Sequence, residues 1–299
     1  MSKGKRPNRQ PIPTSGGARG PAPNLNGSKG QPDPLAGILT ADRAQAPGNV
    51  ESATSRARKV IIGTPAHYSQ VHIAYAFAMD RTRDMARERG IDLSPLYIGG
   101  DAIVQKARND LVMTAIAKEA DDLIFIDADQ DWQPEWVFQL LDWPVDCVGA
   151  PVRKKDPYTE EYNIFVGDAL GFIRHPDGLP ILTSPDLRIG TGFMRYSRRA
   201  LLALWEGAEP YATHRGEARW IFDIRPVNGV LFGEDTVIAD KLRAANIPTW
   251  LDPSMDPGHY GECRVQGAFA KFLGGRQQQI IEQRRNAPPP STPHPAQPS

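Results

Sequence analysis

Short apolar runs alternate with helix-like patterns between residues 59 and 152. Each run is bounded by Gly, Pro or Asp, as buried strands usually are. Strands are therefore expected at Lys59–Pro65, Leu93–Ile98, Leu123–Ile126 and Val145–Val152. An alternation of strands with helices predicts parallel pairing with right-handed crossovers, so the pattern indicates an α/β fold.

The segments between these strands carry apolar residues at helical spacing. Residues 70–89 predict a helix that ends at Gly90. Asp101 is placed to cap the next helix, whose apolar positions run from Ile103 to Ala115. Pro134 stands where a third helix can begin, because proline fits the first helical turn.

The second half of the chain is less regular. Residues 209–232 predict a long loop, and long loops in compact domains are usually functional. Helices are expected at Arg198–Glu206 and 235–246. Strand-like segments are Tyr162–Val166 and Gly171–Arg174 (two short strands or a hairpin), Leu187–Arg195 (interrupted by glycines) and Thr249–Leu251.

Composition divides the 299 residues into one folded region and two tails. Residues 1–56 form a basic Pro- and Gly-rich segment, and residues 276–299 are rich in proline. Such segments bury too little apolar surface to offset chain entropy, so both are expected to be disordered. The remaining 57–275 are expected to form a single α/β domain.

Several classes of protein do not fit the sequence. No apolar run is long enough to cross a bilayer, and the N-terminus lacks the apolar centre of a secretory signal. Cys147 and Cys263 are the only cysteines, which excludes a disulfide scaffold and a structural zinc site. The formal net charge of +0 gives no reason to expect nucleic-acid binding by the folded part. A cytoplasmic location is the default expectation.

The most informative segment is LIFIDADQDW, which begins at Leu123. Alternate residues of a strand share a face, so Asp127 and Asp129 can aim two carboxylates at one point as the strand ends. Open α/β sheets bind ligands at that end. Two carboxylates there suit Mg²⁺ or Mn²⁺. The alternative is a turn with two solvated aspartates.

Three further motifs can lie around the same site. Gly190-Thr191-Gly192-Phe193 is a strand in which glycine marks either a bulge or close approach of a ligand. Glu234 and Asp235 begin a helix, where they either cap the dipole or serve as a base. His259, between two glycines, is either a structural side chain or a ligand.

The order of these motifs resembles that of GT-A-type glycosyltransferases, and most nearly their bacterial and phage branch. The resemblance covers roughly 58–265 and rests on LIFIDADQDW, GAPVRKK, GTGF, GED and GHYG in sequence. It implies a Rossmann-related mixed sheet, mainly parallel and flanked by helices. It also implies a nucleoside-diphosphate sugar donor and a Mn²⁺ or Mg²⁺ cofactor.

The resemblance assigns roles to particular residues. Asp127 and Asp129 bind the metal and the donor diphosphate, and His259 completes the metal ligands. Asp235 is the favoured catalytic base, with Glu234 as the alternative. The residues implied to contact the nucleotide sugar are Thr64, Pro65, Ala66, Arg108, Asn109, Asp127 and Gly192.

Several points stay open at this level. Asp131 is a third nearby carboxylate, so the pair that faces the metal is undetermined. The basic run Arg153-Lys154-Lys155 can reach the diphosphate, but a solvated rim is the favoured interpretation. Trp220 and Phe222 can stack on a sugar, although packing within the loop is favoured. The acceptor (glycan, protein, lipid or modified nucleobase) and the inverting or retaining outcome are not determined.

Two other functions fit the same residues. A metal-dependent nucleotidyltransferase also needs clustered carboxylates on an α/β sheet, but the GxxxxGK[ST] phosphate loop is missing. A non-catalytic sugar- or nucleotide-binding module is the other alternative. It has less need of Glu234 and Asp235 than an enzyme has.

Overall fold

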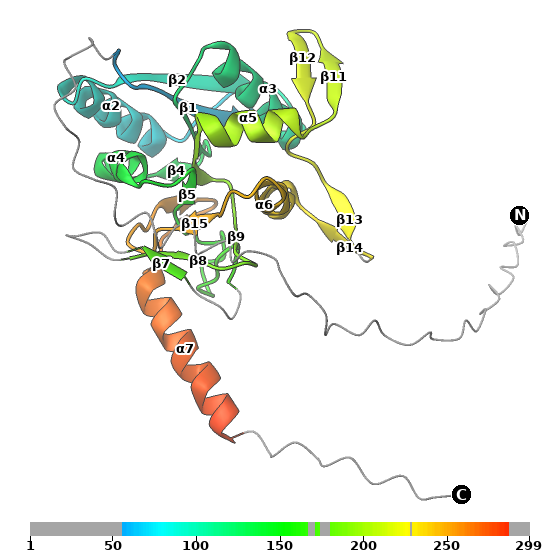
Figure 1. The fold of residues 1–299 in the computed structure, drawn as a ribbon. Coiled ribbons are helices and arrows are strands. Elements are labelled where there is room, and N and C mark those ends of the chain that lie inside the picture. Colours follow the sequence, from blue (N-terminus) through cyan, green and yellow to red (C-terminus); the bar gives the residue numbers. More distant parts are fainter. Residues whose placement is uncertain (1–55, 167–170, 174–179, 228, 287–299) are drawn as a thin grey trace, which may run out of the picture. The chain divides into compact units, whose positions relative to one another are not determined.

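The folded part of the chain is one large mixed sheet with helices on both of its faces (Figure 1). The computed structural model describes residues 56–166, 171–173, 180–227 and 229–286, all within a compact unit that spans Gly48–Ser299. The predictions made for residues 1–55 and 287–299 lie outside the described residues.

The eight-stranded sheet has the order β2-β1-β3-β10-β5-β15-β8-β7. The first three strands pair in parallel, as the alternation of strands and helices predicts. β10 then runs antiparallel between β3 and β5, and β8 runs antiparallel to β15 and β7. The fold is therefore α/β with a mainly parallel sheet. The strands are β1 (Lys59–Ala66), β2 (Asp92–Gly99), β3 (Asp122–Ile126), β5 (Cys147–Gly149), β7 (Gly171–Ile173), β8 (Ile181–Thr183), β10 (Phe193–Ser197) and β15 (Trp250–Leu251).

Helices cover both faces of this sheet. On one face, α3, α5 and α6 enclose a core in which Leu111, Leu201 and Leu242 surround Phe125 of β3. On the other face lie α2 and α4, which contact each other. There Tyr75 of α2 reaches Thr64 of β1. The helices are α2 (Ile73–Glu88), α3 (Val104–Ala117), α4 (Pro134–Asp142), α5 (Arg198–Glu206) and α6 (Glu234–Ala244).

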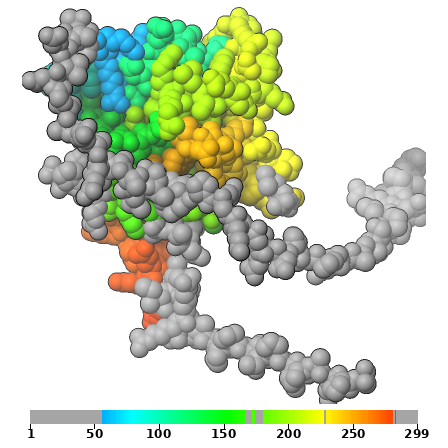
Figure 2. Space-filling model, in the orientation of Figure 1, coloured from blue at the N-terminus to red at the C-terminus, as the bar shows by residue number. Residues whose placement is uncertain are grey.

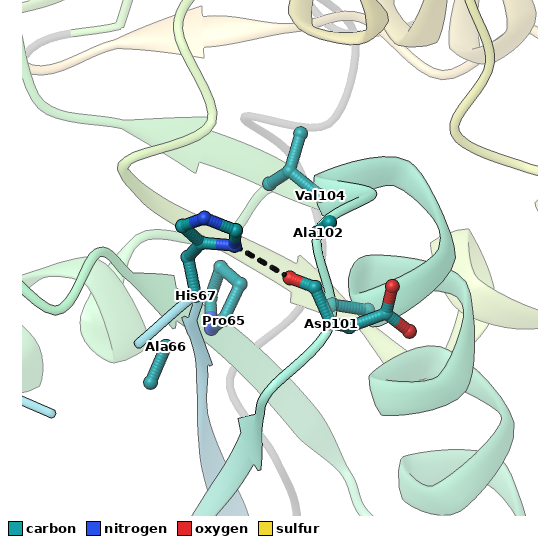
Figure 3. Close-up of a pocket in the computed structure, with 7 residues that line it drawn as sticks. Pro65, Ala66, His67, Asp101, Ala102 and Val104 are labelled. Atoms are coloured by element: carbon teal, nitrogen blue, oxygen red, sulfur yellow. Dashed lines mark hydrogen bonds between the residues drawn. The ribbon is translucent and has the colours of Figure 1, made fainter. Parts of the chain in front are cut away.

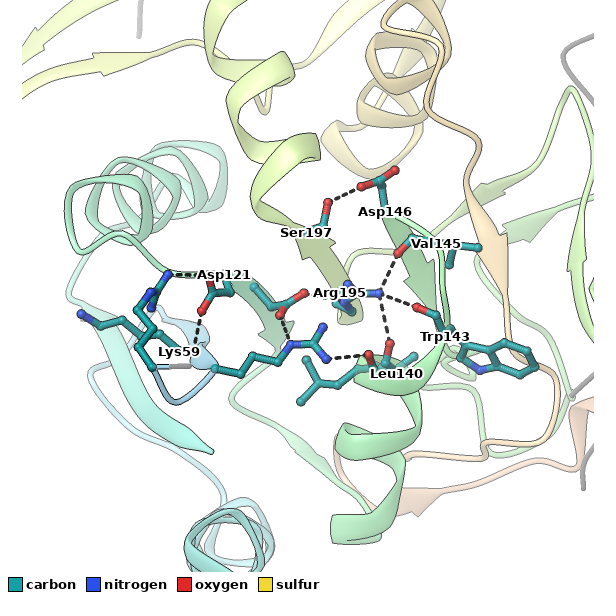
Figure 4. A network of polar contacts seen from close by, with 12 residues as sticks. Lys59, Asp121, Leu140, Trp143, Val145, Asp146, Arg195 and Ser197 are labelled. Atoms are coloured by element: carbon teal, nitrogen blue, oxygen red, sulfur yellow. Dashed lines mark hydrogen bonds and ion pairs between the residues drawn. The ribbon is translucent and has the colours of Figure 1, made fainter. Parts of the chain in front are cut away.

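A buried arginine fixes β10 within the sheet (Figure 4). Arg195 donates from Nε to Asp122 of β3 at 2.7 Å and from Nη1 to the carbonyl of Val145 at 2.7 Å. The same Nη1 reaches the carbonyls of Leu140 and Trp143, so the end of α4 and the loop before β5 are tied to β10. These hydrogen bonds compensate the free energy that it costs to bury the charge of Arg195.

A small second sheet carries the last motif to the end of β3. It has the order β17-β16-β4, with β4 (Gln130–Asp131), β16 (Gly258–Tyr260) and β17 (Arg264–Val265). Gln130 pairs with His259 and Asp131 with Gly258 across the antiparallel ladder. The GHYG segment is thereby placed directly beside the two aspartates.

The predicted loop at 209–232 is wrong, because this stretch contains two β-hairpins. β11 (Pro210–Thr213) pairs with β12 (Gly216–Arg219), and β13 (Arg225–Val227) pairs with β14 (Val230–Phe232). Gly216 and Gly229 have φ of 123° and 79°, positive values that allow the backbone to reverse direction within each hairpin. Several of their side chains are exposed, and Figure 2 shows both hairpins in yellow tones at the surface. Such short exposed strands lack the apolar alternation that sequence patterns detect.

Other element boundaries also differ from the predictions. β5 is only Cys147–Gly149, and Asp101 accepts a hydrogen bond from the amide of Ile103 but does not cap α3. The two segments predicted as a possible hairpin pair elsewhere: β6 (Ile164–Phe165) with β9 (Arg188–Ile189), and β7 with β8.

The C-terminal boundary of the folded domain lies beyond residue 275. α7 runs from Phe269 to Asn286, so residues 276–286 are helical, and the prediction of a tail from 276 is wrong for them. Phe269 and Phe272 pack against Tyr162, which anchors the start of α7. No helix in the described ranges combines the length and apolar character that crossing a bilayer requires.

Candidate functional site

The two aspartates of LIFIDADQDW lie on a turn after β3. The strand ends at Ile126, and the amide of Gln130 donates to the carbonyl of Asp127 at 3.2 Å. The expectation that Asp127 and Asp129 share a strand face is therefore wrong, because alternation holds only within a strand. Their carboxylates have different partners, which define two neighbouring parts of the site.

Arg108 joins the first aspartate to two other motifs. Its guanidinium, only 4% exposed, donates from Nη2 to Oδ1 of Asp127 at 3.0 Å. Nη1 lies 3.5 Å from the carbonyl of Thr191, and Nε lies 3.7 Å from Oε1 of Glu234. One buried cation thus contacts the end of β3, the GTGF segment and the GED helix, three motifs that the sequence places far apart.

Gly192 is required by close approach of protein atoms. A Cβ at this position would lie 2.5 Å from Nε2 of Gln130 and 2.9 Å from Oδ2 of Asp127. Its carbonyl also accepts the amide of Asp127 at 3.0 Å. The predicted cofactor contact of Gly192 stays a prediction. The structure explains the glycine by the fit of Asp127 and Gln130 against it.

Asp129 belongs to a second part of the site, with His259 and Lys155. Nε2 of His259 lies 3.5 Å from Oδ1 of Asp129, and Lys155 donates from Nζ to Oδ2. Nδ1 of His259 is 2.7 Å from the carbonyl of Arg153, which can only accept, so Nδ1 carries a hydrogen. Partial burial raises the pKa of Asp129, but His259 and Lys155 outweigh it and hold that pKa at about 2.

The third carboxylate, Asp131, is occupied by a structural contact. It accepts from Arg264 at 3.0 Å and from the hydroxyl of Tyr260 at 3.1 Å. A Cβ on Gly258 would lie 1.9 Å from Oδ1 of Asp131, so that glycine makes room for the pair. Asp131 therefore stabilises the β4–β16 ladder, and Asp129 is the carboxylate that faces His259.

The two acids that begin α6 have different surroundings. Oε2 of Glu234 accepts from Gln105 at 3.3 Å, and its other oxygen faces Arg108. Asp235 accepts from the side-chain amide of Asn163 and, at 2.8 Å, from the backbone amide of Thr236. Glu234 is therefore part of the cationic network, whereas Asp235 contacts neutral donors.

Two of the residues predicted to bind the nucleotide are structural. The side chain of Thr64 is fully buried, and its hydroxyl lies 2.5 Å from that of Tyr75. Asn109 is also buried, and its amide exchanges hydrogen bonds with the backbone of Phe222 at 2.8 and 3.2 Å. Neither side chain can reach a ligand, because each faces the interior.

A pocket of about 170 Å³ opens where β1 and β2 end and α3 begins (Figure 3). Pro65 and Ala66 line it from β1, and Asp101 and Val104 line it from the other side. Nδ1 of His67 lies 3.0 Å from the carbonyl of Asp101, which links the two loops across the opening. Pro65 thus lines a pocket at the end of the sheet where open α/β sheets bind ligands, and its contact with a nucleotide stays a prediction.

The residues fit a divalent cation in part. Oδ1 of Asp129 is buried without a hydrogen-bond donor, opposite an imidazole nitrogen that is an acceptor when the ring is neutral. Two facing acceptors suit a cation between them. Asp127 is not part of this pair: its Oδ1 accepts from Arg108, and its predicted role as a metal ligand stays a prediction. Within the described ranges, no group of three or more His, Cys, Asp or Glu side chains converges as a metal site.

Other buried polar atoms near Asp127 also make no hydrogen bond. They are Nε of Arg108, both amide atoms of Gln130 and Oγ1 of Thr191. Buried polar groups without hydrogen bonds are rare and costly, and they concentrate at functional sites. Gln130 and Thr191 lie inside the motifs of the sequence, but nothing in the pattern distinguishes them from neighbouring residues.

The basic run and the two aromatic residues are now resolved. Lys155 contacts Asp129, so the interpretation of the whole run as a solvated rim is wrong for this residue. Arg153 donates to the carbonyls of Asp156 and Thr159, which supports its own loop. Phe222 packs in the core, and Trp220 packs edge-on against Tyr211 with ring centroids 5.5 Å apart, as favoured for both.

Comparisons with known proteins yield only weak structural likeness. No family model and no curated protein matches the sequence. The solved structures that this chain resembles include the following three. A197 from STIV aligns at a TM-score of 0.40 and 16% identity over 68% of this chain and 86% of its own. A glycosyltransferase involved in glycosylation of the major capsid of PBCV-1 aligns at a TM-score of 0.27 and 12% identity, over 48% of this chain and 61% of its own. A protein from Desulfovibrio desulfuricans G20, provisionally assigned as a nucleotide-diphospho-sugar transferase, aligns at a TM-score of 0.32 and 14% identity. The alignment covers 66% of this chain and 80% of its own.

Proposed function

We propose that this protein is a metal-dependent glycosyltransferase that moves a sugar from a nucleoside-diphosphate donor to an acceptor hydroxyl. The observation that carries the proposal is the convergence on Arg108. This buried side chain contacts Asp127, Thr191 and Glu234, while Asp129 and His259 pair next to the same turn. A cluster of acids, one fixed imidazole and unpaired buried donors at the carboxyl end of a sheet is typical of a catalytic centre.

Asp129 and His259 are the residues that would hold Mn²⁺ or Mg²⁺. When bound, the cation neutralises the negative charge that grows on the departing diphosphate. Mg²⁺ keeps several water and phosphate ligands and is bound through as few as one or two carboxylates, so a small protein ligand set that includes Asp129 is sufficient. Arg153 fixes the ring of His259 through its carbonyl, so that Nε2 is directed at Asp129.

The pocket at Pro65 and Ala66 is the proposed position of the nucleotide. It lies at the ends of β1 and β2, and the N-terminus of α3 adjoins it through Val104. Free backbone amides at a helix N-terminus favour a negatively charged ligand. The donor would then extend from this pocket toward the turn that carries Asp127 and Asp129.

Asp235 is the proposed base that takes the proton of the acceptor hydroxyl in an inverting reaction. Its partners, Asn163 and the amide of Thr236, are neutral, whereas Glu234 faces the guanidinium of Arg108. Glu234 is therefore assigned to positioning Arg108, and Asp235 to proton transfer.

The proposal is tested in two steps with the full chain. A thermal-shift screen of UDP, GDP, ADP and TDP, with and without Mn²⁺, should raise the melting temperature for one base and more strongly with the metal. The sugar donors of that nucleotide are then assayed for release of the nucleoside diphosphate. Release of pyrophosphate from the corresponding nucleoside triphosphate in the presence of a sugar phosphate, with no release of diphosphate from the sugar donors, would instead identify a nucleotidyltransferase. Binding without turnover on any donor would identify a binding module.

A further inference from the structure

Lys155 is held against Asp129 by a specific seat. It follows β5 on the loop that also carries Arg153, and its ammonium donates to Oδ2 of Asp129. The stem of Lys155 passes over Gly261, where a Cβ would lie 3.3 Å from Cδ of the lysine. The absence of a side chain at Gly261 therefore lets the lysine lie across the GHYG segment and reach the carboxylate.

The neighbouring Lys154 is different in kind. It pairs with Glu161 at 3.1 Å, and both side chains are well exposed. Exposed pairs of this type contribute little free energy. Lys155 instead contacts Oδ2 of Asp129, and the other oxygen of that carboxylate faces His259. The ammonium of Lys155 is therefore next to the proposed position of the divalent cation.

We propose that Lys155 substitutes for the divalent cation on Asp129 and moves onto the donor diphosphate when that cation binds. The inference rests on the proposed function and names a further donor-binding residue. A lysine suits this exchange, because its ammonium is a mobile point charge on a flexible stem. Its side chain is 40% exposed, so it is free to turn toward a ligand. Phosphate oxygens are strong acceptors for such a charge.

A single substitution then has opposite effects on two affinities. Lys155→Met keeps the stem over Gly261 and removes the charge. Without the competing ammonium, Mn²⁺ alone should bind about two- to fivefold more tightly, as expected for loss of a partly exposed ion pair. The nucleoside diphosphate, measured at saturating Mn²⁺, should bind about tenfold more weakly, because one charge-assisted hydrogen bond to phosphate is lost.

The experiment uses the full chain and two calorimetric titrations for each variant. Mn²⁺ is titrated first into the metal-free protein, and UDP or GDP is then titrated at saturating Mn²⁺. Lys154→Met is the matched control, since it removes the same charge one residue away from the site. Melting temperatures of the three proteins confirm that each is folded.

The expected result is tighter Mn²⁺ and weaker nucleotide binding for Lys155→Met, with neither change for Lys154→Met. Unchanged or weaker Mn²⁺ binding by Lys155→Met would overturn the proposal that Lys155 and the divalent cation compete for Asp129. Unchanged nucleotide binding would overturn the contact with the diphosphate. In both cases the proposed function stands if the wild-type protein binds Mn²⁺ and nucleotide. If the wild-type protein binds neither, the proposed function and this inference fail together.

Discussion

Nε2 of His259 lies 3.5 Å from Oδ1 of Asp129, an oxygen that is buried without a hydrogen-bond donor. The ring cannot turn freely, because its Nδ1 donates to the carbonyl of Arg153 at 2.7 Å. When the ring is neutral, its Nε2 is an acceptor that faces this carboxylate oxygen. The proposed cation would be held between His259 and Asp129, so substitution of either residue tests the proposal directly.

Asp129→Asn should weaken Mn²⁺ binding at least about tenfold, since loss of groups that bind or orient a metal costs this much or more. Calorimetric titration with Mn²⁺ measures the change. Asp131→Asn is the control, because Asp131 is two residues away but is engaged by Arg264 and Tyr260. Asp131→Asn should lower the melting temperature and leave Mn²⁺ affinity near that of the wild type. Equal Mn²⁺ affinity in Asp129→Asn and wild type would contradict the metal assignment.

Arg108→Lys should reduce kcat/KM for the donor about tenfold to a hundredfold while the protein stays folded. Lysine keeps the charge but lacks the fork of donors that reaches Asp127, Thr191 and Glu234 together. Misplacement of groups in an active site by even 1 Å has effects of this size. Steady-state kinetics with the best sugar donor from the nucleotide screen measures it.

Arg195→Lys provides the comparison for Arg108. Arg195 is also buried and also donates to several acceptors. These acceptors are the carboxylate of Asp122 and three backbone carbonyls, none of which belongs to the motifs of the candidate site. Arg195→Lys should lower the free energy of unfolding and leave kcat/KM little changed. If both lysine variants reduce kcat/KM to the same extent, Arg108 has no special role in the site.

Gly192→Ala should lower the free energy of unfolding by about 1–3 kcal/mol, the usual cost of forcing atoms into a packed site. The new methyl would displace Gln130 and Asp127, which lie 2.5 and 2.9 Å from its position. Urea denaturation measures the loss. Gly274→Ala is the opposite case, because nothing lies within 4 Å of its Cβ position and it is in α7. That variant should be stabilised by about 0.5–1 kcal/mol through helix propensity. A neutral Gly192→Ala would show that Asp127 can move freely.

The parallel half of the fold could be predicted because β1 and β3 are buried on both faces. Runs such as Leu123–Ile126 are continuously apolar, and each is followed by a helical pattern with a recognisable boundary. The insertion of β10 between β3 and β5 is not visible in the same way. It pairs segments about 70 and 50 residues apart in the sequence, and local patterns carry no information about such contacts.

The candidate site could be predicted as a set of motifs but not residue by residue. The order of the motifs predicts that Asp127, Asp129, Glu234 and His259 share one site; the structure joins Asp127 and Glu234 to Arg108 and pairs Asp129 with His259. The order of the motifs could not show that Thr64 and Asn109 point into the core, because that depends on strand register and helix rotation. Lys155 was missed because adjacent lysines look alike in sequence. Its contacts with Asp129 and Gly261 distinguish it from Lys154, which pairs with Glu161.

The last prediction concerns stability in acid and the carboxylate of Asp146, just before β5. Partial burial raises the pKa of Asp146, but hydrogen bonds from Arg199 and Ser197 outweigh it and place that pKa below its usual value. Ser197 donates to Oδ1 at 2.6 Å and Arg199 donates from Nε to Oδ2 at 2.9 Å. Since the folded-state pKa is the lower one, the carboxylate stabilises the fold above the unfolded-state pKa. This contribution is lost as the pH falls through the folded-state value.

Asp146→Asn should therefore lower the free energy of unfolding by up to about 1 kcal/mol at pH 7, since Arg199 is well exposed and its charge is screened. The difference from the wild type should shrink from about pH 4 downward, near the ordinary aspartate pKa of about 3.9, as the wild-type carboxylate becomes protonated. Urea denaturation between pH 3 and 7 measures it. Asp142→Asn, at the exposed end of α4, should show no such trend. A difference for Asp146→Asn that stays constant down to pH 3 would contradict the assignment, because it would not depend on the charge.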